Sequence, residues 1–272
     1  MTTTVRDVTL SLDRGDLDLT LTVDERGEGR PILLLHGGGG PLTVASFAGL
    51  LAEQRPARVL TPVHPGFHGT ARPDWLTDVP TLAQVYVRLL DALGLDDVTV
   101  VGNSVGGWIA AEAALLGSER ISAAVLVDPV GIHVPGHPVA DPLSLTPAEL
   151  ARLAYHEPAK FGIDPAALSE EQRAVMAGNR AAIAAYSGPH LMADPTLRER
   201  LAKVALPTRV VWGESDRVVD LDYGHAYAEA IPGAEFVLLH RTGHLPQIET
   251  PEQLLPAVWD FAEAHAAGRQ RR

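Results

Sequence analysis

Apolar residues occupy every second position early in the chain, over residues 8–12 and again over 17–23. A period of two is typical of a strand with one face in the core and the other in water. We therefore predict two antiparallel strands, joined by a turn around Arg14-Gly15.

Further along, short continuous apolar runs alternate with segments of helical periodicity. Continuous runs are typical of strands that are covered on both faces. Alternation of such strands with helices predicts a mostly parallel sheet with helices on both faces. The predicted strands cover residues 31–35, 58–62, 98–101, 121–127, 208–212 and 235–239, and the predicted helices cover 81–93, 108–116, 226–230 and 252–267.

The alternation breaks between residues 131 and 206, where no apolar strand run occurs. We predict three helices in this segment, over 147–153, 170–186 and 195–204. Thr146, Ser169 and Asp194 are the expected N-caps, because Ser, Thr and Asp side chains bind the free N–H groups of a first turn. The chain then divides into a core of residues 1–130 and 207–272 and a helical lid of residues 131–206.

The strongest chemical signal is Gly-Asn-Ser-Val-Gly at residues 102–106, between a predicted strand and a predicted helix. In that context the pattern predicts a tight turn that exposes the hydroxyl of Ser104 above the sheet. The backbone of Ser104 then lies at a helix N-terminus, where negative charge is favoured. We predict that Ser104 is a nucleophile. Phosphate binding by a glycine-rich turn is the alternative.

A serine nucleophile needs a base, and the base needs an acid that orients it. His244 lies in a loop between the last predicted strand and the last helix, and we predict that it is the base. Asp216, in the loop after the strand 208–212, is the predicted acid. Asp128, which follows the strand 121–127, is the competing candidate. The chain order serine, acid, histidine is the order found in α/β-hydrolases.

Stabilising an oxyanion requires two N–H donors. The turn supplies the N–H of Val105, and the loop His-Gly-Gly-Gly-Gly-Pro at residues 36–41 can supply a second. Glycines let a backbone approach a ligand closely, and we predict Gly38 as the second donor. The loop lacks the G-K-[ST] ending of a phosphate-binding loop.

These motifs together resemble the α/β-hydrolase superfamily over nearly the whole length. The resemblance rests on residues 36–39, on 64–70, where His64 and Thr70 depart from the family pattern, and on 102–107, 213–216, 243–244 and 249–251. It implies an α/β-hydrolase fold: a mostly parallel eight-stranded sheet with helices on both faces and a helical lid insertion.

Serine at the turn favours acyl chemistry, so the primary expectation is a hydrolase of carboxylic esters, lactones or thioesters. The motifs Gly-Asn-Ser-x-Gly-Gly and His-Gly-Gly-Gly also resemble a subgroup that cleaves carbon–carbon bonds in vinylogous diketones from aromatic-ring fission. That subgroup usually has a tryptophan soon after the catalytic histidine, and this chain has none there. A ligand-binding member of the fold without catalytic activity is a third reading.

Substrate contacts are less well defined by the sequence. The residues predicted to contact substrate are Gly37, Trp108, Arg180, Tyr186 and Leu245, with Arg180 as a candidate anchor for a carboxylate. Tyr155, Phe161, Leu191 and Met192 are further candidates for the pocket walls. Packing within the core or the lid explains Trp108 and the lid residues equally well.

Composition limits the classes of partner and site that we expect for this protein. A net charge of −12 argues against nucleic acid or an anionic membrane as the main partner. The absence of cysteine excludes disulfides and thiolate metal sites. The N-terminus shows no apolar signal segment and the chain shows no membrane-spanning run, so we expect a cytoplasmic protein. We expect no cofactor and no metal, a small-molecule substrate, and a monomer or homodimer. The basic tail 268–272 is expected to be a frayed terminus.

Overall fold

The computed structural model describes residues 3–12, 17–188 and 190–266. The elements, in chain order, are β1 (Thr3–Leu12), β2 (Leu17–Arg26), β3 (Arg30–Leu35), α1 (Leu42–Gln54), β4 (Ala57–Pro62), α2 (Val79–Leu93), β5 (Val98–Asn103), α3 (Val105–Leu115), β6 (Ile121–Val127), α4 (Pro147–Ala154), α5 (Pro158–Phe161), η1 (Pro165–Ala167), α6 (Glu170–Tyr186), α7 (Leu197–Arg200), η2 (Leu201–Lys203), β7 (Thr208–Gly213), α8 (Leu221–Glu229), β8 (Glu235–Leu239), α9 (Pro246–Glu249) and α10 (Pro251–Ala264).

The strands form one sheet of eight strands in the order β1-β2-β4-β3-β5-β6-β7-β8. β2 runs antiparallel to both β1 and β4, and the other neighbouring strands are parallel. The prediction of a mostly parallel sheet with an antiparallel pair at its start is confirmed. The predicted turn at Arg14-Gly15 and the tail 268–272 lie outside the described residues.

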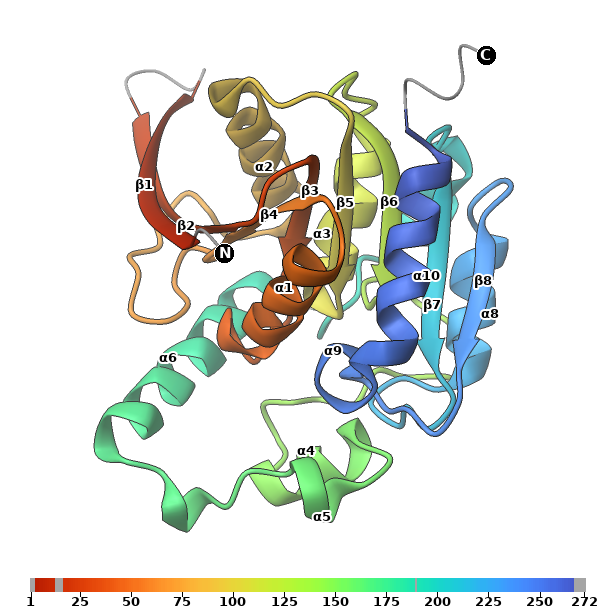
Figure 1. Cartoon of the computed structure of the whole chain (residues 1–272). Coiled ribbons are helices and arrows are strands. Elements are labelled where there is room, and N and C mark those ends of the chain that lie inside the picture. Colours follow the sequence, from red (N-terminus) through yellow and green to blue (C-terminus); the bar gives the residue numbers. More distant parts are fainter. Residues whose placement is uncertain (1–2, 13–16, 189, 267–272) are drawn as a thin grey trace.

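Helices cover both faces of this sheet (Figure 1). α1 and α10 pack on one face, and α2, α3 and α8 pack on the other. The sequence of β5 is continuously apolar because both of its faces are covered. Val100 packs in the core on the α2–α3 side, and the next residue, Val101, packs on the α1–α10 side.

The segment between β6 and β7 forms a helical insertion, in which α4, α5 and α6 lie beyond the ends of the strands (Figure 1). The predicted caps of its first two helices are confirmed, because Thr146 and Ser169 each form a capping box. The two ends of the insertion meet before residue 206, because Gly131 and Ala193 form a β-bridge. The division of the chain into core and lid stays a prediction, and this bridge favours residue 193 as the end of the lid.

The third predicted helix of the insertion is replaced by two short elements, α7 and η2. Leu197 and Leu201 are fully buried in the main core. Asp194 is not the N-cap: Thr196 holds that position, and Asp194 instead accepts a hydrogen bond from the N–H of Thr196 at 2.8 Å. These contacts favour placing residues 194–206 with the core, beyond the end of the lid.

Candidate active site

Ser104 lies at the sharp turn between β5 and α3. Its backbone has φ 59° and ψ −118°, which is a strained conformation for a residue with a Cβ. Its N–H donates to the carbonyl of Val127 at 2.9 Å, and its own carbonyl accepts from the N–H of Trp108 at 3.0 Å. The turn is thus held on both sides, and it presents Ser104 to a cavity, as expected of a nucleophile elbow.

Two glycines make this turn possible. A Cβ on Gly102 would lie 2.0 Å from the carbonyl oxygen of Gly106, and a Cβ on Gly106 would lie 2.3 Å from the carbonyl oxygen of Leu35. Both separations are far below van der Waals contact, so any side chain there would force β3, β5 and α3 apart.

Asp216 and His244 form a buried hydrogen-bonded pair. The Nδ1–H of His244 donates to Oδ2 of Asp216 at 2.7 Å. The other carboxylate oxygen of Asp216 accepts from the N–H groups of Val218 and Val219, at 2.8 and 3.2 Å. Because Nδ1 carries the proton of the neutral ring, the lone pair is on Nε2, the atom that a general base uses. His244 lines the same cavity as Ser104.

The competing acid, Asp128, is fully buried beside this pair. Its Oδ1 accepts from the N–H of Gly213 at 2.8 Å, while the imidazole of His244 is bonded to Asp216. Burial, and then the charge of Asp216, raises the pKa of Asp128 well above its ordinary value. The geometry favours Asp216 over Asp128 as the acid.

The glycine loop after β3 is held by two stacked, buried histidines, His36 and His64. The Nδ1–H of His36 donates to the carbonyl of Gly37 at 2.8 Å, and its Nε2 accepts from the N–H of His64 at 3.1 Å. The Nε2–H of His64 donates to the carbonyl of His36 at 2.8 Å, and its Nδ1 accepts from the hydroxyl of Tyr86. Each ring nitrogen has a single role, which requires both rings to be neutral.

Burial keeps these rings neutral: it lowers the pKa of His36 well below its ordinary value, with His64 as a second cause, and lowers the pKa of His64 to about 4. Because a peptide unit is planar, with its C=O and N–H pointing in opposite directions, the hydrogen bond to the carbonyl of Gly37 also sets the direction of the Gly38 N–H. Gly38 and Val105 both line the cavity. The N–H of Val105 is the first in α3 and has no partner within that helix. This placement suits the two predicted oxyanion donors.

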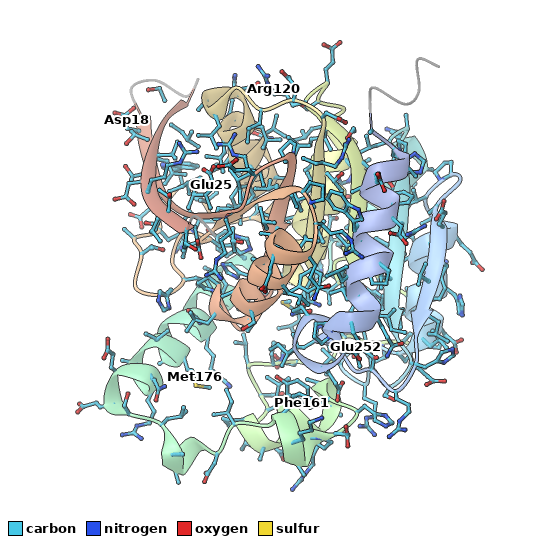
Figure 2. The ribbon with its side chains drawn as sticks, viewed as in Figure 1. Asp18, Glu25, Arg120, Phe161, Met176 and Glu252 are labelled. Carbon is cyan, nitrogen blue, oxygen red and sulfur yellow. The ribbon has the colours of Figure 1, made fainter. Side chains whose placement is uncertain are left out.

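The cavity has a volume of about 270 Å³ and opens between the turn at Ser104 and the helical insertion. Its lining is mostly aliphatic. Among the described residues that line it, Arg180 is the only Lys, Arg, Asp or Glu. Met176 of α6 also lines it, and Figure 2 labels this side chain and Phe161 of α5 within the insertion.

The predicted substrate contacts divide into two groups. Arg180 and Leu245 line the cavity, as do Tyr155 and Met192 among the candidate wall residues. The lining does not include Gly37, Trp108, Tyr186, Phe161 or Leu191. For these residues the contact with substrate stays a prediction that the lining does not support, and packing accounts for three of them. Tyr186 is buried and donates to the carbonyl of Pro65 at 3.0 Å, Phe161 stacks on Tyr155, and Gly37 lies against Ser104, whose Cβ would be 3.1 Å from an added side chain.

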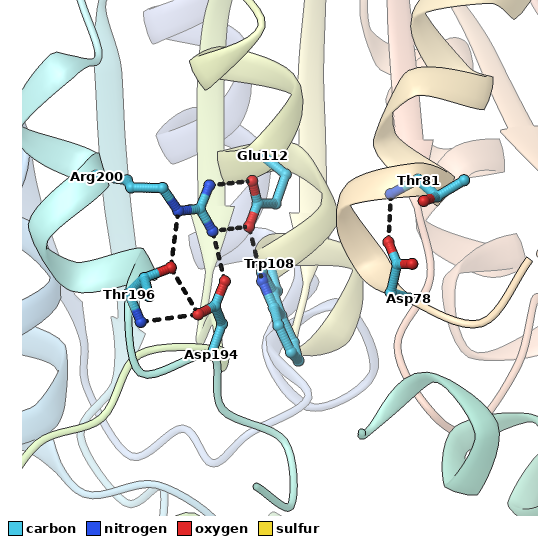
Figure 3. A network of polar contacts seen from close by, with 7 residues as sticks. All are labelled: Asp78, Thr81, Trp108, Glu112, Asp194, Thr196 and Arg200. Atoms are coloured by element: carbon cyan, nitrogen blue, oxygen red, sulfur yellow. Dashed lines mark hydrogen bonds and ion pairs between the residues drawn. The ribbon is translucent and has the colours of Figure 1, made fainter. Parts of the chain in front are cut away.

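Trp108 belongs to a polar network behind the turn (Figure 3). Its Nε1–H donates to Glu112 at 3.4 Å. The guanidinium of Arg200 forms a bidentate pair with Glu112, at 2.7 Å for both bonds, and also binds Asp194 at 2.6 Å. The network therefore joins the segment that follows the insertion, at Asp194 and Arg200, to α3, the helix that follows Ser104.

Two residues that the sequence analysis did not single out position the base loop. Asn103 donates to the carbonyl of His244 at 2.9 Å and accepts from Gln247 at 3.0 Å. The carboxylate of Glu249 accepts from the N–H groups of Gly243 and His156, at 2.6 and 3.1 Å. The signals available were the position of Asn103 inside the turn motif and that of Glu249 in the base loop.

Comparison with known proteins agrees with this geometry. The model of the alpha/beta hydrolase family matches residues 32–257, so the chain belongs to this family, and it is a hydrolase. It is 31% identical over 262 residues to 2-hydroxymuconate semialdehyde hydrolase of Pseudomonas putida, covering 89% of this chain and 90% of that protein.

Solved structures share the fold. A thermophilic esterase from Thermogutta terrifontis has a TM-score of 0.75 at 22% identity, over 96% of this chain and all of the other. A meta-cleavage product hydrolase from Pseudomonas fluorescens IP01 has a TM-score of 0.74 at 22% identity, over 90% and 94% of the two chains. At this level of identity the likeness shows the fold alone. In the described part of the chain, no helix has the length and apolar character needed to cross a bilayer.

Proposed function

We propose that this hydrolase cleaves a carbon–carbon bond in a vinylogous diketone that carries a carboxylate, and that Ser104, His244 and Asp216 form its triad. The relative from Pseudomonas putida is named for 2-hydroxymuconate semialdehyde, a related compound that has an aldehyde in place of one ketone. This reading replaces ester hydrolysis as the leading function. The proposed substrate is a small molecule, whereas the cytoplasmic location and the oligomeric state stay predictions.

The observation that carries the proposal is Arg180, the only Lys or Arg among the described residues that line this mostly apolar cavity. The guanidinium of Arg180 donates to the carbonyls of Leu143 and Leu145, at 2.6 and 3.2 Å. These two contacts leave further N–H groups of Arg180 that can bind a carboxylate. A ligand with one carboxylate and an apolar remainder matches this distribution of charge. α6, which carries Arg180, and α4 are then the parts of the insertion that act as a lid.

In the proposed reaction, Ser104 Oγ attacks the carbonyl carbon next to the bond to be broken, while His244 takes the proton of the hydroxyl. The N–H groups of Gly38 and Val105 bind the resulting oxyanion. When the oxyanion collapses, the carbon–carbon bond breaks, and its electron pair is delocalised into the conjugated carbonyl. His244 returns the proton to that carbon fragment. Water, deprotonated by His244, then hydrolyses the acyl-enzyme to a carboxylic acid.

Ester hydrolysis remains the second candidate, and Leu245 favours it. This leucine lines the cavity directly after His244, in the region where the carbon–carbon subgroup usually has a tryptophan. A cavity that is apolar on this side also suits a neutral acyl chain.

The test compares turnover of 2-hydroxymuconate semialdehyde with turnover of a p-nitrophenyl ester series, acetate to palmitate. We expect the higher kcat/KM for the ring-fission product. Arg180→Gln should raise the KM for the ring-fission product by roughly 10–100-fold, because it removes one charge-assisted hydrogen bond to the carboxylate. The KM for the neutral ester should stay unchanged. Arg173→Gln, an exposed arginine of the same helix, is the matched control. Turnover of esters alone would assign the second function.

A further inference from the structure

Asp128 is a buried carboxyl that the reaction above does not use. It follows β6 directly, with a φ of 44°, in the left-handed region that Asp and Asn tolerate better than most side chains. Its N–H donates to the carbonyl of Val211 at 2.9 Å, and its Oδ1 accepts from the N–H of Gly213 at 2.8 Å. Both contacts fix Asp128 against β7, the strand from which the acid loop emerges.

This carboxyl lies beside the predicted acid and base. One ligand atom from each of Asp128, Asp216 and His244 lies within 4.8 Å of the other two, and all three residues are buried. Within the described part of the chain, Asp216 and His244 are the titratable groups that face Asp128. Two buried carboxylates this close repel each other strongly, so one of them must hold a proton.

The hydrogen bonds favour Asp128 as the neutral carboxyl. Asp216 accepts three N–H groups, from His244, Val218 and Val219, and such bonds favour its charged form. Asp128 accepts one, and its Oδ2 has no partner among the described residues although it is buried. A carboxylate has about four acceptor positions, so Asp216 retains one that a donor can fill. A proton on Oδ2 of Asp128 would satisfy both groups.

We propose that Asp128 is a positioning residue of the triad: it remains a neutral carboxylic acid and donates a hydrogen bond to Asp216, which in turn orients His244. The donated bond restrains the carboxylate of Asp216 and withdraws charge from it. The imidazole is thereby held in place without becoming too basic to give up its proton. The inference rests on the proposed triad.

Infrared spectroscopy of the whole protein tests the protonation directly. The difference spectrum between the wild type and Asp128→Asn should contain the carbonyl band of a protonated carboxylic acid at neutral pH. A difference spectrum with carboxylate bands alone would overturn the proposal. This readout needs no substrate, so it remains valid even if Ser104→Ala retains turnover and the proposed function fails.

The pKa of His244, followed by NMR titration, tests the link to the base. Asp128→Asn keeps a neutral donor beside Asp216, so the pKa of His244 should stay at its wild-type value. Asp128→Ala removes the donor and should raise this pKa by about 1, together with a lower kcat that Asp128→Asn largely restores. If Asp128 were charged, Asp128→Asn would lower the pKa of His244 by about 1 or more. If Asp128→Ala does not fold, the asparagine variant decides the question alone.

Discussion

Asn179 of α6 holds the glycine loop at Gly39: its Nδ2–H donates to the carbonyl of Gly39 at 3.0 Å. Its Oδ1 accepts from the N–H of His68 at 2.9 Å, so one side chain joins the insertion to two loops of the core. The fit is close, because a Cβ on Gly40 would lie 2.5 Å from Nδ2 of Asn179. α6 is therefore part of the framework that holds the predicted oxyanion donor Gly38.

Replacing this amide should weaken catalysis more than stability. Asn179→Leu removes both hydrogen bonds, and we expect kcat to fall by about tenfold, which corresponds to roughly 1.4 kcal/mol of lost positioning. Steady-state kinetics and thermal unfolding measure the two effects separately. Glu171→Gln, an exposed residue of the same helix, is the control. An unchanged kcat in Asn179→Leu would show that the loop holds its shape without α6.

The buried histidines make the fold sensitive to acid. The pKa of His64 is about 4 in the folded protein and is near 6.5 when the chain is unfolded. As the pH falls from 6.5 to 4, the unfolded chain therefore binds a proton that the folded protein does not. Stability that is present above pH 6.5 should be lost progressively in this window, by about 3 kcal/mol for one such group.

Urea unfolding at pH 7, 5 and 4 measures this loss. His64→Gln should lower the free energy of unfolding at pH 7 and flatten its dependence on pH between 6.5 and 4. His133→Gln, which changes an exposed histidine, should retain the wild-type dependence. The same dependence in His64→Gln and the wild type would contradict the role assigned to His64.

The pair of Arg200 and Glu112 should matter for stability because the carboxylate is buried, with its side chain 5% exposed. Arg200→Gln leaves that charge without its cation and should cost about 3–5 kcal/mol. Glu112→Gln should partly restore the stability of Arg200→Gln in the double variant, as it removes the unpaired charge. Urea unfolding of the three variants measures this coupling. Additive losses would mean that the two side chains act independently.

Asp216 is expected to act on catalysis through His244. Asp216→Asn should reduce kcat by about 10⁴-fold, because the amide favours the wrong tautomer of the imidazole. Steady-state kinetics measures the loss, and the unfolding midpoint shows that the fold is retained. A reduction of less than tenfold would mean that another group orients the base.

Much of the fold is predictable from the sequence because its central strands are covered on both faces. Such strands must be continuously apolar, and β6 begins and ends at the predicted residues. The cavity-facing turn is equally visible, since only glycine fits beside Ser104 at residues 102 and 106.

Helices without local end signals are harder to predict. α1 begins at Leu42 after the N-cap residue Pro41, which makes no side-chain cap, and its first turn has no acidic residue. The sequence therefore carries little signal for this helix. At Asp194 the sequence predicts an N-cap that the structure does not form, because the carboxylate of Asp194 binds Arg200 instead.

Roles that depend on distant partners are also hidden from the sequence. Trp108 and Tyr186 are plausible pocket residues by position, yet their polar atoms bind Glu112 and the carbonyl of Pro65. Asn179 gives no sequence signal, because its partners lie 111 and 140 residues away.

The central claim is that Ser104 is the nucleophile, and its direct test is the kcat of Ser104→Ala relative to the wild type on the better substrate. We expect a reduction of roughly 10⁴–10⁶-fold, the scale seen when a triad loses its nucleophile, with an unchanged unfolding midpoint. Turnover within tenfold of the wild type, in a protein that is folded, would contradict the account.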